Sequence, residues 1–179
     1  MLALVVGTAA AAACSERKPP PVAVGRDMLG EQADQIMFNI NTILTDRGMM
    51  RAQLQADTAY FFDDNSRVEL RGVQTTFYDA TGKRSSVLTS REGTYNMRSQ
   101  ETEARKNVVV VSDEGRRLET EQLRYNQVRD EISSDSAFVL TEPTRRLTGI
   151  GFVSDPNMRH VQVLKVTPGS TGTFTLPGQ

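Results

Sequence analysis

Apolar and polar residues alternate in short runs along most of this chain. In the run DQIMFNINTIL, Ile36, Phe38 and Ile40 fall on one side of an extended strand, because side chains alternate between the two faces of a strand. Polar clusters rich in Gly, Asp, Asn and Ser separate the runs, as at Asp46-Arg47-Gly48. The pattern predicts an all-β domain of antiparallel strands over residues 32–167.

The first run has a helical alternative, a helix from Met28 to Leu44. Ile36 and Ile40 partly fit its period of 3.6 residues. Asn39 and Asn41, however, are poor helix formers. We therefore expect a strand for most of this segment.

A repeat with a period of 30 residues links distant parts of the chain. The stretch LTSREGTY (Leu88–Tyr95) resembles LETEQLRY (Leu118–Tyr125), which begins 30 residues later, and LTGIGFVS (Leu147–Ser154) is a weaker copy. Repeats of this length usually correspond to stacked supersecondary units. No helix of ordinary length fits between the copies, so the units are expected to be strand pairs added one after another.

The second copy changes its inward-facing side part of the way along. Leu118 and Thr120 share one face of an extended strand, whereas Leu123 and Tyr125 share the other. A bulge or corner near Glu121 would let both pairs face the interior. A chain that bends in this way can pass from one layer to the other of a folded-over sandwich.

Composition narrows the possible functions. The 179 residues suffice for one domain, and 21 Lys and Arg residues nearly balance 22 Asp and Glu residues. Nucleic-acid binding would need a basic excess, so we expect no nucleic-acid partner. Aromatic residues make up 6% of the chain and Trp is absent, so the core must consist mainly of Val, Ile and Leu.

The N-terminal segment has the pattern of a signal peptide over residues 1–13. Small residues fill the places before the expected cut, and Ala11-Ala12-Ala13 directly precedes Cys14. This arrangement resembles the bacterial lipobox, which predicts a diacylglycerol on Cys14. The alternative is an ordinary signal peptide followed by a free cysteine. As Cys14 is the only cysteine, it cannot form an internal disulfide.

The predicted β-domain has an extended segment on each side. Residues 14–31 contain Lys18-Pro19-Pro20-Pro21 and are expected to form a lipidated, Pro-rich tether. Residues 168–179 are rich in Gly, Pro and Thr and are expected to form a flexible tail. No apolar run reaches the roughly 18–20 residues of a membrane-spanning helix.

The β-rich segments together resemble the LptC family of lipopolysaccharide-export proteins. The resemblance covers about Gln32 to Lys165 and rests on VQTTFYDATGKRSSVLTSREGTY, LETEQLRYNQVRDEISSDSAFVL and LTGIGFVSD in that order. It implies a twisted, boat-like antiparallel β-jellyroll. It also implies a periplasmic protein that receives lipopolysaccharide from an inner-membrane ABC transporter of the LptBFG type. An apolar groove would take the lipid A acyl chains and pass them to an LptA-like bridge protein.

Three other functions stay open beside this interpretation. The related bridge protein LptA shares the fold and part of the pattern. The chain could instead be a structural adaptor with a filled core, or a lipid or lipoprotein chaperone with a closed cavity.

The usual family member has a transmembrane anchor, whereas this chain is expected to use lipidated Cys14. Ser15 after the cysteine would favour the outer membrane, but the family role predicts the periplasmic face of the inner membrane.

Candidate site residues follow from the apolar positions of the expected strands and from the family pattern. Gly149 matches the glycine of the family L-x-G motif, which is tied to function there. In LTGIGFVSD, alternation would place Gly149 and Gly151 on one face. Val161 and Val163 belong to HVQVLKV, the expected edge strand for a partner. The candidate groove residues are Phe38, Leu54, Leu70, Phe77, Leu88, Tyr95, Val110, Leu118, Leu123, Tyr125, Phe138 and Phe152.

No arrangement typical of an enzyme is present, so we expect neither catalysis nor a metal or cofactor. His160 is the only histidine and is expected on a strand surface, and no Gly-flanked serine accompanies it. Asp63-Asp64 is expected to be a solvated turn, since it lacks the spacing of a calcium loop. Arg116-Arg117 and Arg145-Arg146 could contact lipid A phosphates or be ordinary exposed arginines.

Overall fold

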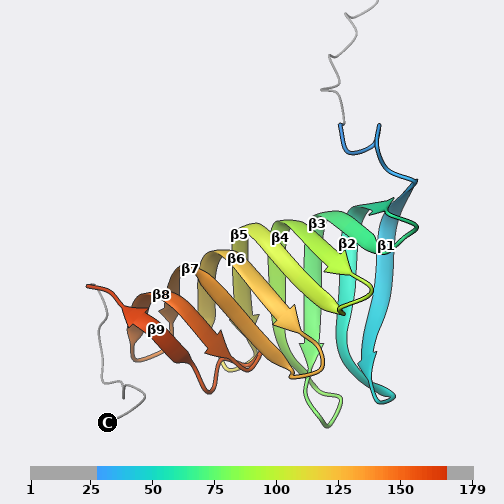
Figure 1. Cartoon of the computed structure of the whole chain (residues 1–179). Helices are drawn as coiled ribbons and strands as arrows, with labels where there is room; N and C mark the ends of the chain where they lie inside the picture. The colour runs from blue at the N-terminus through green and yellow to red at the C-terminus, as the bar shows by residue number, and fades with distance from the viewer. Residues whose placement is uncertain (1–27, 169–179) are drawn as a thin grey trace, which may run out of the picture.

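The computed structural model describes residues 28–168 and forms one sheet that bends over on itself (Figure 1). Residues 28–34 form turns that lead into the first strand. The expected signal peptide, Cys14 and most of the tether lie outside the described residues, as does the expected tail beyond Pro168.

The nine strands of this sheet follow one another in chain order. Each pairs antiparallel with the next, so β1 and β9 form the two edges. They are β1 (Gln35–Asp46), β2 (Met49–Phe62), β3 (Arg67–Tyr78), β4 (Arg84–Asn96), β5 (Glu101–Ser112), β6 (Arg117–Asn126), β7 (Glu131–Thr141), β8 (Arg146–Ser154) and β9 (Gln162–Val166). The sheet is not closed into a barrel, and the prediction of an all-β, jellyroll-like fold is confirmed.

The segment Gln35–Asp46 is a strand, as the poor helix formers Asn39 and Asn41 predicted, and the helical alternative is wrong. The expected turn after it is present. Arg47 and Gly48 both have positive φ, at 49° and 79°, and connect β1 to β2. Two successive residues of this kind suit a tight hairpin, because their backbone twist matches that of the flanking strands.

A line of register shifts crosses the sheet and bends it into two layers. Each shift lies beside the one in the neighbouring strand, and the bulge predicted near Glu121 is confirmed. Because of it, Leu118 and Leu123 are both buried despite their opposite parity. The shifts lie at Thr89–Glu92, Arg105–Val108, Thr120–Arg124 and Ser134–Ala137.

The same line continues through Gly151 and corrects one expectation about β8. Gly151 has a φ of 73°, in the left-handed region, so simple alternation ends there. Gly149 and Phe152 are both buried although their parity differs. The two glycines therefore do not form one bare face, because the bulge turns the strand between them.

The 30-residue repeat corresponds to alternate strands of the sheet. Its copies lie in β4, β6 and β8, and each is followed by a partner strand that returns antiparallel. The expectation of stacked strand pairs is confirmed. Leu88 and Leu118, which begin the two stronger copies, are both buried.

Two clusters of buried apolar side chains lie between the layers. The smaller one, here called the N-terminal cluster, consists of Leu54, Ala56, Ala59, Val68, Leu70 and Val73. The larger one, here called the C-terminal core, consists of Leu44, Ala52, Phe77, Leu88, Ala104, Val108, Val110, Leu118, Leu123, Tyr125, Ile132, Phe138, Leu140, Leu147, Phe152 and Met158.

Candidate functional site

An open apolar groove lies beside the N-terminal cluster, between β1 and the facing parts of β2, β3 and β4. Its volume of about 450 Å³ falls within the range of ligand pockets. We call it the N-terminal groove. Its lining consists of Met37, Phe38, Asn39, Ile40, Asn41, Thr42, Leu54, Phe61, Val68, Leu70, Tyr95 and Met97.

The local sequence of β1 explains why this groove stays open. Asn39 has a φ of 52°, a conformation that Asn adopts more readily than most residues. The pairing skips Asn39: Phe38 pairs with Thr58 and Ile40 with Ala56. Within β1 only Leu44 is buried, since no second layer formed by residues 28–168 covers the rest of the strand.

The exposed lining is unusual for a protein in water. Phe38 is 69% exposed, and Met97, in the turn after β4, is 47% exposed. Contiguous exposed apolar side chains of this size mark binding surfaces more often than chance. The Tyr95 phenol in the wall of the groove is uncharged at neutral pH, and burial raises its pKa further above the usual value.

The structure brings four of the predicted groove residues together in the N-terminal groove: Phe38, Leu54, Leu70 and Tyr95. The other eight lie in the C-terminal core, namely Phe77, Leu88, Val110, Leu118, Leu123, Tyr125, Phe138 and Phe152. Sequence reasoning missed Phe61 and Met97. Met97 had one detectable signal, because a large apolar residue is unusual in the polar turn NMRSQ.

The C-terminal core is filled by aromatic contacts. Phe77 and Tyr125 meet edge to face with ring centroids 4.8 Å apart, and Phe138 and Phe152 do so at 5.0 Å. Pairs in this geometry stabilise a core beyond the area that they bury. Acyl chains cannot enter this region unless these side chains move.

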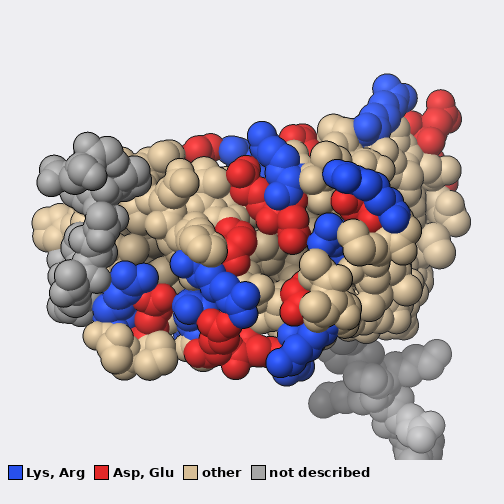
Figure 2. Space-filling view, turned by 90° about the horizontal axis from the view of Figure 1, so that it is seen from below, with Lys and Arg blue, Asp and Glu red and all other residues tan. Residues whose placement is uncertain are grey.

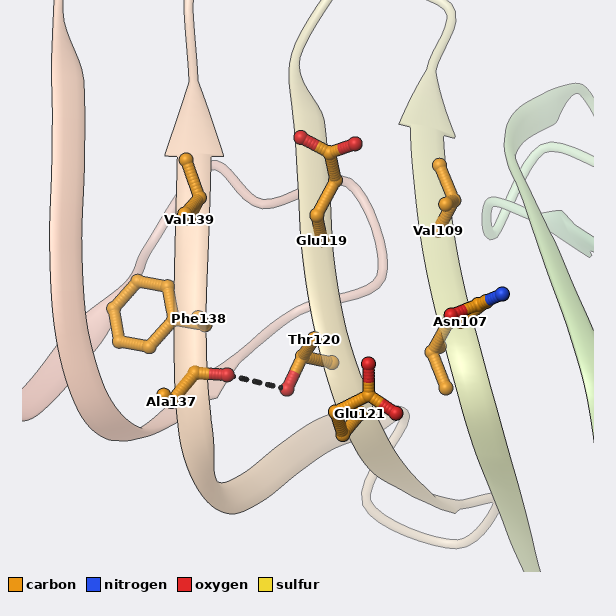
Figure 3. A pocket seen from close by; sticks show the side chains of 9 residues that line it. Asn107, Val109, Glu119, Thr120, Glu121, Ala137, Phe138 and Val139 are labelled. Carbon is orange, nitrogen blue, oxygen red and sulfur yellow. Dashed lines mark hydrogen bonds between the residues drawn. The ribbon is translucent and has the colours of Figure 1, made fainter.

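A second hollow lies on the face of β5, β6 and β7 that is turned away from the core (Figure 3). Val109 and Val139 lie in it beside Glu119 and Glu121, and its volume is about 460 Å³. The Thr120 hydroxyl donates a hydrogen bond to the Ala137 carbonyl at 2.9 Å beneath it. Because two carboxylates line this hollow, it suits acyl chains less well than the N-terminal groove does.

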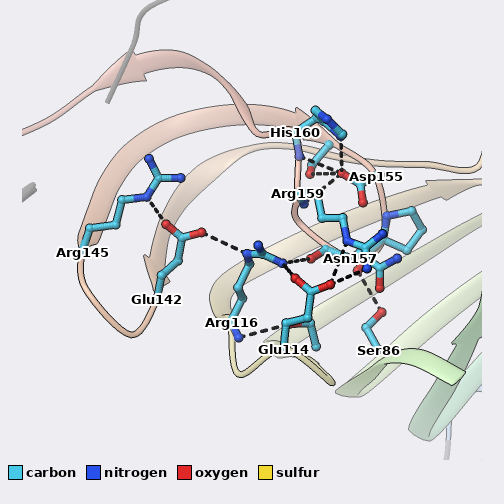
Figure 4. A network of polar contacts seen from close by, with 12 residues as sticks. Ser86, Glu114, Arg116, Glu142, Arg145, Asp155, Asn157, Arg159 and His160 are labelled. Carbon is cyan, nitrogen blue, oxygen red and sulfur yellow. Dashed lines mark hydrogen bonds and ion pairs between the residues drawn. The ribbon is translucent and has the colours of Figure 1, made fainter. Parts of the chain in front are cut away.

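Three of the four arginines considered for phosphate contacts pair with carboxylates instead. Arg116 donates to Glu142 at 3.1 Å and also pairs with Glu114, while Arg145 pairs with the same Glu142 (Figure 4). Arg117 lies 3.1 Å from Glu119. Their charges are thus largely compensated.

The same network ties together the loops at one end of the C-terminal half. Arg159, after β8, pairs with Glu114 in the β5–β6 turn, and the Ser86 hydroxyl donates to the Pro156 carbonyl at 2.8 Å (Figure 4). The Asp155 carboxylate accepts the backbone N–H groups of Arg159 and His160 at 3.0 Å and 2.9 Å. These contacts hold the segment between β8 and β9 against the beginning of β4.

The residues considered for catalysis or metal binding lie in turns and connections. His160 lies in the connection before β9 and not on a strand as predicted, and its side chain is exposed. Asp63 and Asp64 lie in the β2–β3 turn, where Asp63 pairs with Arg67 at 3.2 Å. Within residues 28–168 no group of His, Cys, Asp and Glu side chains could hold a metal ion. On the face seen in Figure 2, charges of both signs are interspersed.

The edge strand β9 is arranged around Gly149. A Cβ atom at Gly149 would lie 2.7 Å from the Lys165 carbonyl oxygen of β9 and 2.8 Å from the Phe138 ring. Val161 precedes the strand, and both Val161 and Val163 pack against the C-terminal core. The Thr167 N–H donates to the Thr148 carbonyl at 3.0 Å. Alternation then directs the Val163 N–H toward β8 and the Leu164 N–H toward the free edge.

Comparison with known proteins gives the family. A family model of lipopolysaccharide-assembly, LptC-related proteins matches residues 3–171, and no curated protein matches the chain. The chain therefore belongs to the LptC-related family, whose members are components of lipopolysaccharide transport on the periplasmic side of the inner membrane. Among residues 28–168, no helix is long and apolar enough to cross a membrane.

Proposed function

We propose, from its membership of the LptC-related family, that this protein receives lipopolysaccharide from an inner-membrane ABC transporter and passes it to a periplasmic bridge protein. The observation that carries the proposal is the N-terminal groove, where Phe38 and Met97 remain exposed beside buried Leu54 and Leu70. Moving an acyl chain out of water gains about 0.8 kcal/mol for each buried CH₂ group. A groove with this lining can therefore hold the acyl chains of lipid A without any catalysis.

The two edges of the sheet support a role between two partners. Among the described strands, β1 and β9 each have a neighbour on one side only, and the groove lies at the β1 end. A partner with the same fold can add a strand at such an edge and continue the apolar lining. In this arrangement β1 faces the transporter that delivers the lipid, and β9 faces the bridge protein that accepts it.

The membrane anchor is part of the proposal. A lipid on Cys14 would hold the protein at the periplasmic face of the inner membrane, with residues 14–31 as the tether. Mass spectrometry of the mature N-terminus tests this, and a Cys14→Ala protein is expected in the soluble periplasmic fraction. An unmodified Cys14, or cleavage elsewhere, would overturn the anchor but not the groove.

Site-specific photocrosslinking tests lipid binding. A benzoylphenylalanine at Phe38 is expected to crosslink added lipopolysaccharide, because this side chain lines the groove. The matched control is the same group at Val128, which is 60% exposed in the β6–β7 turn and does not line the groove. Equal yields at both positions would contradict a groove and leave the adaptor as the better interpretation. Co-purification with the ABC transporter then separates an export component from a free lipid carrier.

A further inference from the structure

Two turns that are far apart in the chain meet where the layers of the sheet close. Gln127, in the β6–β7 turn, is buried, and its side-chain amide donates a hydrogen bond to the Thr45 carbonyl near the end of β1. These residues are 82 positions apart in sequence. The contact therefore joins the first hairpin of the sheet, β1–β2, to the sixth, β6–β7.

Charged side chains continue this contact. Arg51 Nη2 lies 3.8 Å from Asp46 Oδ2, and Arg51 Nη1 lies 3.9 Å from Asp130 Oδ2. The Tyr125 hydroxyl donates to Asp130 Oδ1 at 3.2 Å. The Tyr125 phenol is a hydrogen-bond donor at neutral pH, and burial, with Asp130 adding to it, raises its pKa further above the usual value. We call Thr45, Asp46, Arg51, Gln127 and Asp130 the clasp.

The clasp holds Tyr125 in the C-terminal core, two strands away from Tyr95 in the wall of the N-terminal groove. Thr102 of β5 pairs with Tyr95 on one side and Tyr125 on the other, so the three side chains form a row across β4, β5 and β6. Tyr95 lines the groove and packs against both apolar clusters. Tyr125 belongs to the C-terminal core and rests on Phe77.

At the boundary between the groove and the core, packing and hydrogen bonding are less complete than in the rest of the described interior. A void of about 10 Å³, close to the size needed for one water, is lined by Val73, Thr102 and Tyr125 among others. The Thr102 hydroxyl and the Arg51 Nε are buried without a hydrogen-bond partner among the described residues. Buried polar groups without partners destabilise the closed arrangement.

We propose that Tyr125 is a gate between the N-terminal groove and the C-terminal core, held closed by the clasp. Acyl chains in the groove reach the C-terminal half when the β1–β2 and β6–β7 turns separate and the Tyr125 ring leaves Phe77. This proposal rests on the proposed function, since it assumes that acyl chains enter the groove. Opening breaks a few polar contacts at the lip of the sheet and moves the Tyr125 ring.

A reversible lock tests the gate. Thr45→Cys and Gln127→Cys would be joined by a short thiol-specific crosslinker that can be removed by reduction, in a full-length Cys14→Ala background without other thiols. Purified lipopolysaccharide would be the probe, with benzoylphenylalanine at Phe38 for the groove and at Phe138 for the core. The lock is expected to leave crosslinking at Phe38 unchanged and to reduce it at Phe138 by about tenfold, a difference that reduction restores.

Two further variants complete the test. Tyr125→Phe keeps the ring and removes only the hydrogen bond to Asp130, so crosslinking at Phe138 is expected to rise by about threefold to tenfold. A lock between Glu114→Cys and Arg159→Cys, at the end already closed by ion pairs, is the control and should change neither yield. Thermal unfolding of each variant shows that it is folded.

The outcomes separate the gate from the function on which it rests. No crosslink at Phe38 in the unlocked protein would overturn the proposed function. A crosslink at Phe38 with equal Phe138 yields in the locked and reduced clasp would overturn the gate alone. A loss of the Phe138 yield under the control lock as well would also overturn it, because general stiffening and not the clasp would then limit entry.

Discussion

Strands β5 to β9 and strands β1 to β3 belong to one continuous sheet, yet their interiors differ. Around the C-terminal strands, Tyr125, Phe138 and Phe152 fill the space between two layers, together with Phe77 from the end of β3. Around the N-terminal strands the buried cluster contains no aromatic ring, and Phe38, Phe61 and Tyr95 border the open groove. A repeating strand unit thus builds a closed core where a second layer covers it and a binding surface where the first strand has no cover.

The polar contacts of the two regions differ as well. The C-terminal end is closed by loop-to-loop ion pairs such as Arg159 with Glu114. Outside the clasp, the N-terminal half has pairs between neighbouring strands on the outer face, such as Arg71 of β3 with Glu92 of β4 at 2.9 Å. Those pairs stiffen the sheet but do not draw β1 toward the opposite layer, so the groove stays open.

The largest expected difference is in the free energy of unfolding between two variants that each lose a phenylalanine ring. Phe152→Ala removes a ring that is 1% exposed and should lower the free energy of unfolding by about 3–5 kcal/mol, since a cavity is left behind. Phe38→Ala removes a ring that is 69% exposed and should change it by less than about 0.5 kcal/mol. Urea denaturation of both variants measures this. Similar losses would mean that β1 is packed as tightly as β8.

A charge at Gly149 should affect transfer more than folding. In Gly149→Arg the new side chain meets the backbone of the edge strand β9, so we expect that strand to shift at a cost of about 1–3 kcal/mol. Lipid transfer to a bridge protein should be lost. The matched control is Ile150→Arg, at a neighbouring exposed position. A thermal midpoint that collapses in step with transfer would make the glycine purely structural.

Proline substitutions in β9 separate the partner edge from the sheet. Leu164→Pro removes an N–H on the free side, so it should weaken partner binding with little change in stability. Val163→Pro removes an N–H that faces β8 and should destabilise the fold by about 1 kcal/mol. Partner affinity and denaturation are measured on both. Unchanged affinity in Leu164→Pro would count against β9 as the docking edge.

The smallest expected effect is the pH-dependent contribution of Glu92 to stability. Glu92 accepts a hydrogen bond from Lys106 at 2.9 Å and lies 2.9 Å from Arg71, and these contacts hold the pKa of the Glu92 carboxyl below its usual value. A lowered carboxyl pKa stabilises the fold above the ordinary pKa and loses this effect as the pH falls. Glu92→Gln should therefore cost up to about 1 kcal/mol near neutral pH.

The pH profile provides the check on this last prediction. The difference between Glu92→Gln and the unsubstituted protein should shrink as the pH falls below the ordinary glutamate pKa of about 4.3, and it should disappear once the pH is below the lowered pKa of Glu92. Glu119→Gln, on the outer face of β6, is the control and should stay within about 0.5 kcal/mol. A difference that persists in acid would show that shape, and not charge, makes Glu92 important.

Local sequence was sufficient to predict the strands, the first turn and the bulge in β6. The alternation in the strands, the Arg47-Gly48 turn and the parity change around Glu121 all depend on residues a few positions apart. Backbone preference and side-chain period act over that distance, so they can be read from the sequence. The 30-residue repeat and the family resemblance rest on the same local features in a constant order.

Only the tertiary structure decided which apolar residues line a groove and which fill a core. Phe38 and Phe138 both stand in alternating runs, and only the presence of a covering layer distinguishes them. The pairing of Arg116 with Glu142 and the clasp between Thr45 and Gln127 likewise depend on segments 26 and 82 residues apart. Burial and ion pairing are set by which distant strands meet, and the bends at the bulges determine that meeting.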